Sequence, residues 1–157
     1  MAHLLVARLL VAVALLAALG LGGCAVRLAP DYDAALVTGI QKANEEAMVL
    51  FAGVGAGTKP ATFPKRADAY ANVIGKLDAL RVSALARLAP SAPGFLGSGK
   101  LPDAPTPQVL EEASTVMIKM RDTDAARGLS PMLVGGFREA FGLSIQQALV
   151  YERALQR

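Results

Sequence analysis

The chain has 157 residues, a length that suits one domain. Hydrophobic residues make up 54% of it and the mean hydropathy is +0.41, an excess that lies largely in the first 26 residues. The net charge of +3 comes from basic and acidic residues that alternate without a cluster, which argues against a nucleic-acid partner. The single cysteine, Cys24, excludes an intramolecular disulfide, and the single histidine, His3, lies in the leading segment.

The first 23 residues have the pattern of a secretory signal. The amino terminus and Arg8 carry positive charge, and the stretch Leu9–Leu19 is apolar without interruption. Its 11 residues match the length of a signal's hydrophobic core. Three glycines follow before Cys24 and favour an extended backbone that a peptidase can bind. The sequence therefore predicts a signal peptide over residues 1–23.

The end of this segment, Leu21-Gly22-Gly23-Cys24, resembles the lipobox of bacterial lipoproteins. The resemblance implies that the thiol of Cys24 receives diacylglycerol and that the signal is cut between Gly23 and Cys24. It also implies acylation of the new amino group, with chains such as palmitate. Ala25 follows, where an aspartate would retain a Gram-negative lipoprotein at the inner membrane. The resemblance thus implies a periplasm-facing outer-membrane protein, or one anchored in the cell membrane of another host.

Two other interpretations of this region are weaker. Residues 9–26 are uncharged and nearly long enough to cross a bilayer as an uncleaved helix. The glycines and the position of Cys24 argue against it. A catalytic cysteine would need a base nearby, and His3 lies in the segment that is removed.

Residues 24–32 are expected to form a lipidated tether. The eight residues after Cys24 span at most about 28 Å when fully extended, so the domain would stay close to its membrane.

Four stretches with helical spacing predict an antiparallel four-helix bundle over residues 33–157. They run from Tyr32 or Asp33 to Ala52, from Lys65 to Leu88, from Thr106 to about Arg127, and from Ser130 to about Leu155. The expected core stripes are Leu36, Ile40, Ala43, Ala47 and Phe51; Tyr70, Val73, Leu77, Leu80, Ala84 and Leu88; Val109, Ala113, Val116 and Met120; and Val134, Phe137, Phe141, Ile145, Ala148 and Leu155. Residues 53–64 and 89–105 are expected to be loops.

The helix starts carry capping signals. Asp31 or Asp33 can cap the first helix, and Thr106 and Ser130, each followed by proline, are expected to cap the third and fourth.

Three patterns could carry chemistry, and each has a simpler interpretation. The glycine-rich stretch Gly53–Lys59 lacks the order of a phosphate loop, because Thr58 precedes the lysine and a helix precedes the loop. Four methionines could bind copper(I) but more often fill a core: Met48, Met117, Met120 and Met132. The carboxylate pairs point apart on a helix, so we expect a solvated surface at Glu45-Glu46, Glu111-Glu112 and Asp122-Asp124.

We therefore expect no catalytic, cofactor-binding or metal-binding residue. The stretch Pro30–Asp33 resembles the start of small, mostly uncharacterised helical lipoproteins. The first functional hypothesis is a non-enzymatic, lipid-anchored module of the cell envelope with a structural or protein-interaction role. The alternative is a lipoprotein that binds a small apolar or lipid-like ligand, and a weaker third is an enzyme that uses only carboxylates, tyrosines or lysines.

Overall fold

The computed structural model describes residues 29–88 and 104–156, and this part of the chain is helical. It contains α2 (Ala34–Val54), the 3-10 helix η1 (Pro60–Lys65), α3 (Ala67–Ala86), α4 (Thr106–Arg127) and α5 (Pro131–Ala154). The four long helices pack against one another, which confirms the helical bundle. Their bounds differ from the expected ones by only a few residues, except that the expected loop at 53–64 includes η1.

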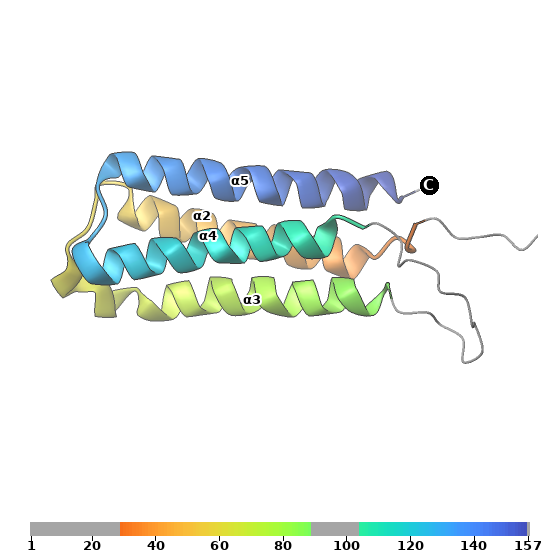
Figure 1. Cartoon of the computed structure of the whole chain (residues 1–157), viewed down its shortest axis with the longest axis horizontal. Helices are drawn as coiled ribbons and strands as arrows, with labels where there is room; N and C mark the ends of the chain where they lie inside the picture. The colour runs from red at the N-terminus through yellow and green to blue at the C-terminus, as the bar shows by residue number, and fades with distance from the viewer. Residues whose placement is uncertain (1–28, 89–103, 157) are drawn as a thin grey trace, which may run out of the picture.

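The four helices form a ring in which each packs against two neighbours. Helix α2 packs against α3 and α5, and α4 packs against the same two, while within these described helices the backbones of the diagonal pairs, α2 with α4 and α3 with α5, do not come as close. Figure 1 shows successive helices running in opposite directions. The turn end of the bundle holds η1 and the short α4–α5 turn. The opposite end, called here the tether end, holds the start of α2 and the end of α5.

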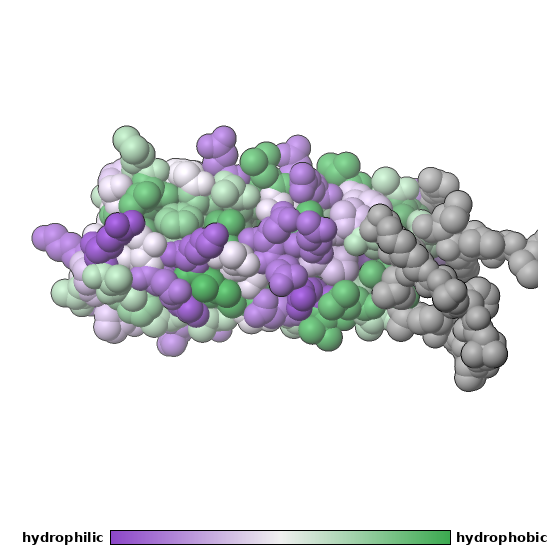
Figure 2. Space-filling model, in the orientation of Figure 1, coloured by the Kyte–Doolittle hydropathy of each residue, from purple (hydrophilic) through white to green (hydrophobic). Residues whose placement is uncertain are grey.

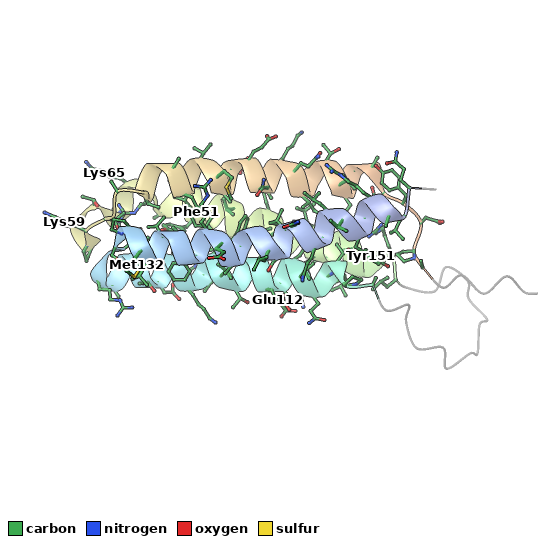
Figure 3. All side chains as sticks on the ribbon, turned by 90° about the horizontal axis from the view of Figure 1, so that it is seen from above. Phe51, Lys59, Lys65, Glu112, Met132 and Tyr151 are labelled. Carbon is green, nitrogen blue, oxygen red and sulfur yellow. The ribbon has the colours of Figure 1, made fainter. Side chains whose placement is uncertain are left out.

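The core is built from the predicted stripes. Most of the predicted residues are buried, including Ile40, Leu77 and Phe141, which are fully inaccessible to solvent. Small residues such as Ala43 and Ala113 alternate with Tyr70 and the aromatic pair Phe51–Phe141, whose ring centroids lie 5.7 Å apart. Figure 3 shows Phe51 between α2 and α5. Burial of one such large side chain stabilises the fold by roughly 1.5–3 kcal/mol.

Two of the predicted helix caps are confirmed and one is wrong. The carboxylate of Asp33 accepts hydrogen bonds from the backbone N–H groups of Ala35 and Leu36. Ser130 caps α5 through Leu133. Thr106 is instead the first residue of α4, and no side chain caps that helix. Its hydroxyl donates a hydrogen bond to a buried glutamate on α5, an acceptor that local sequence does not reveal.

The signal peptide, Gly23, Cys24 and most of the expected tether lie outside the described residues. Within the described ranges, the helices are too short or too polar to span a bilayer.

Candidate functional site

A buried carboxylate, Asp124 on α4, organises the turn end of the bundle. Its side chain is completely inaccessible to solvent. The guanidinium of Arg66 donates to both carboxylate oxygens, and the hydroxyl of Thr58 donates to one of them. The hydroxyl of Tyr70 lies 3.0 Å from the other oxygen. The carboxylate therefore joins α4 to α3 and to the segment that follows α2.

The electrostatics of this cluster keep Asp124 ionised. Burial acts to raise the pKa of its carboxyl group, but the hydrogen bonds from Arg66, Thr58 and Tyr70 outweigh it, so the pKa lies below its usual value. Burial, followed by the negative charge of Asp124, raises the pKa of Tyr70. The hydrogen bond to Asp124 raises the pKa of Arg66. The cluster is thus a charged pair with a neutral tyrosine, and its protonation is fixed at neutral pH.

The same end is tied together by two loops. The N–H of Thr58 donates to the carbonyl of Leu129 (2.8 Å), and the N–H of Leu129 donates to the hydroxyl of Thr58 (2.8 Å). Gly57 and Gly128 both have positive φ, at 91° and 75°, which L-residues with side chains rarely adopt. The glycine-rich stretch 53–59 is therefore the end of a helix and a structural turn that contacts the α4–α5 turn.

A second buried carboxylate, Glu152 on α5, has the corresponding role at the tether end. Arg87 binds it with two nitrogens, at 2.7 and 3.1 Å, and the hydroxyl of Thr106 donates to it at 2.6 Å. Arg87 also donates to the backbone carbonyl of Asp31 at 3.0 Å. The cluster connects the end of α3, the start of α4, the end of α5 and the residues that lead into α2.

Sequence reasoning missed both buried acids. We expected Asp124 to be solvated with Asp122, and that expectation is wrong: Asp122 is exposed, whereas Asp124 is buried. A signal was present in the spacing. Asp124 follows Met120 by four residues and Glu152 follows Ala148 by four, so each acid continues the core stripe of its helix.

These two clusters are built to hold the fold. The carboxylate oxygens of Asp124 and Glu152 accept hydrogen bonds from several donors. The side chains of their partners Arg66 and Arg87 are only 13% and 16% exposed. A general acid or base needs a pKa near the working pH, and the pKa of Asp124 is shifted away from it. The geometry therefore supports a structural role.

The remaining candidate residues do not come together at one place. Met117 and Met120 lie in the core, whereas Met132 is 86% exposed at the start of α5 (Figure 3). Glu111 pairs with Arg81 at 3.1 Å and Glu46 pairs with Lys76 on the surface. Within the described ranges, no group of three or more potential ligands from His, Cys, Asp and Glu forms a metal site.

An open groove of about 430 Å³ lies between α2 and α3. Four of its seven lining residues are apolar and three are polar: Val49, Leu50, Ala69 and Val73, and Glu45, Glu46 and Asn72. Val49 is 74% exposed here. The groove has the size of a small-ligand site, but it is open to solvent along its length.

The expected lipidation site, Cys24, and the expected cleavage position after Gly23 fall outside the described residues. The first described residues, 29–33, lie at the tether end. Comparisons with protein families, with curated proteins and with solved structures found no match.

Proposed function

We propose that this protein is a lipid-anchored module of the bacterial cell envelope with a non-enzymatic, structural or protein-interaction role. The observation that carries the proposal is the order of features before the bundle: a charged start, an apolar core, a glycine break and Cys24 in a lipobox-like sequence. In a Gram-negative host, Ala25 after the cysteine favours the periplasmic face of the outer membrane.

The tether end is suited to hold an anchored chain. The seven residues Ala25–Asp31 span at most about 24 Å, so Asp31 lies within that distance of the lipidated residue. Arg87 binds the carbonyl of Asp31 and, through Glu152, connects it to α5 and to Thr106 on α4. A force on the tether would therefore be distributed over all four helices.

The anchor is tested by metabolic labelling. Labelled palmitate added to the producing bacterium should enter the wild-type chain and not a Cys24→Ser variant. Immunoblotting of whole cells controls for the amount of each protein. Equal labelling of both proteins, or no labelling of the wild type in a host with lipoprotein-processing enzymes, would contradict the proposal.

The groove between α2 and α3 favours a second candidate function, binding of a small apolar ligand. The exposed Val49 and the buried Leu50 and Val73 offer an apolar surface for it. A fluorescent apolar probe should then bind the wild type and lose affinity in a Val49→Glu variant. Equal binding by Val49→Glu and by the exposed control Val82→Glu on α3 would exclude the groove as the site.

A further inference from the structure

The outer face of α5 has the spacing of a helix–helix contact. Positions at alternating intervals of three and four residues form a seam of Leu133, Gly136, Ala140, Leu143, Gln147, Val150 and Ala154, and all seven are exposed. Leu133, Leu143 and Val150 are 38%, 59% and 62% exposed. Sustained spacing of this kind is typical of the seam between two packed helices. Figure 3 looks down onto this face of α5.

The bundle itself does not use this seam. Among the described helices, α5 packs only on α2 and α4, through a different face that includes Phe141, Ile145 and Ala148. A Cβ added at Gly136 would meet nothing within 4 Å. The same is true of Gly75, Gly135 and Gly142, so the open space at Gly136 shows only that a second helix has room to approach the seam closely.

We propose that the seam is the interface of an antiparallel dimer, in which α5 of one copy packs against α5 of a second copy. In this register Leu143 lies opposite Gln147 of the second copy, Ala140 opposite Val150, and Gly136 opposite Ala154. The Ala140–Val150 layers thus pair a smaller with a larger side chain, and the Gly–Ala layers let the backbones approach closely.

Charge selects the antiparallel direction. Glu139 and Arg153 flank the seam on one side, and neither makes an ion pair within the described residues. In the proposed register Glu139 faces Arg153 of the second copy, and the two-fold axis repeats the pair. A parallel dimer would hold Glu139 and Arg153 at different heights, about 21 Å apart along the helix, so this ion pair would not form.

The contact is modest in size. The seam spans 22 residues from Leu133 to Ala154, about 33 Å of helix. One helix pair of this length reaches the lower end of the roughly 1,200–2,000 Å² that stable interfaces bury. We therefore expect a weak dimer in dilute solution, which confinement to one membrane would strengthen. Because the two tether ends then lie at opposite ends of the dimer, the bundles would lie along the membrane.

Disulfide crosslinking in isolated cell envelopes tests the proposal on the full chain. In the antiparallel register, residue 140 of one copy lies next to residue 150 of the other, while two copies of residue 150 are separated by about 15 Å along the helix. A disulfide needs Cα atoms within about 7 Å. Cells that make Ala140→Cys and Val150→Cys chains together should therefore yield a crosslinked dimer, and cells that make either chain alone should not.

Two controls accompany this experiment. The wild type reports any background from Cys24, and Val82→Cys, on the exposed outer face of α3, reports random collision. Dimers from Val150→Cys alone would indicate a parallel pair, and an adduct of another mass would indicate a different protein on α5. Either result, or no crosslinking in any strain, would overturn the proposal.

A charge reversal tests the register without new cysteines at the seam. The dimer is trapped with a photochemical crosslinker that does not react through lysine. Its yield should fall severalfold in Glu139→Arg, and adding Arg153→Glu should restore the yield. Circular dichroism of each variant confirms that the bundle is folded. A double variant that stays as weak as the single one would contradict the register.

Discussion

Two buried acids connect the helix ends of this fold. Asp124 and Glu152 lie at opposite ends of the bundle, and each is neutralised by one arginine and supported by hydroxyl groups from other segments. A buried ion pair adds little stability compared with apolar packing, but removal of one partner leaves a charge without compensation. The two clusters therefore fix how the helix ends meet.

Asp124→Ala should lower the free energy of unfolding by about 3 kcal/mol, because it leaves Arg66 and the hydroxyl of Tyr70 without their acceptor. Urea denaturation followed by circular dichroism measures the change. The matched control is Asp122→Ala, two residues away and exposed, which should stay within about 0.5 kcal/mol of the wild type. Equal effects of the two substitutions would contradict the role assigned to Asp124.

The same carboxylate should make stability dependent on acid pH. Its pKa is lower in the folded chain than in the unfolded chain, so its contribution is complete above the unfolded pKa of about 3.9 and is lost as the pH falls through the folded pKa. Thermal melts from pH 7 to pH 2 should show a steeper acid loss of Tm for the wild type than for Asp124→Asn. Parallel curves for the two proteins would argue against the shift.

At the scale of the helices, the sequence predicted most of what is observed. The apolar stripes identified all four long helices, because the core faces repeat at three and four residues. The capping signals were less reliable. Thr106-Pro107 and Ser130-Pro131 look alike, yet only Ser130 caps its helix, since Glu152, 46 residues away in sequence, binds the hydroxyl of Thr106. Local patterns cannot reveal a partner that only the packed bundle brings near.

Alanine substitution should change the stability of the protein in opposite directions at Gly75, inside α3, and at Gly128, in the α4–α5 turn. Gly75 on α3 has nothing within 4 Å of an added Cβ, so Gly75→Ala should stabilise the protein by about 1 kcal/mol. Gly128→Ala should destabilise it by about 1–3 kcal/mol, because φ is +75° and the new Cβ would collide with the backbone of Thr58. Denaturation curves of the two variants measure both effects. A shift of the same sign in both would contradict this distinction.

At the scale of the whole molecule, the candidate function depends on residues before the bundle. The fold provides a helical bundle with an attachment point at Asp31, whose carbonyl Arg87 binds, and an unpartnered seam on α5. Figure 2 shows hydrophilic residues gathered over α4, in the middle of the face seen there. The lipid anchor itself was predicted from residues 21–24. The seam on α5 was not predicted from the sequence, because its residues could not be told from ordinary helix surface before the core face of α5 was known.

Mass spectrometry of the amino-terminal peptide, from protein purified out of its membrane, tests the lipid anchor at the atom that carries it. The peptide of a lipid-anchored module should begin at Cys24 and carry a diacylglycerol group on the thiol, with or without a further acyl chain on the amino group. A peptide that begins at Met1, or one that contains an unmodified Cys24, would contradict the lipid anchor.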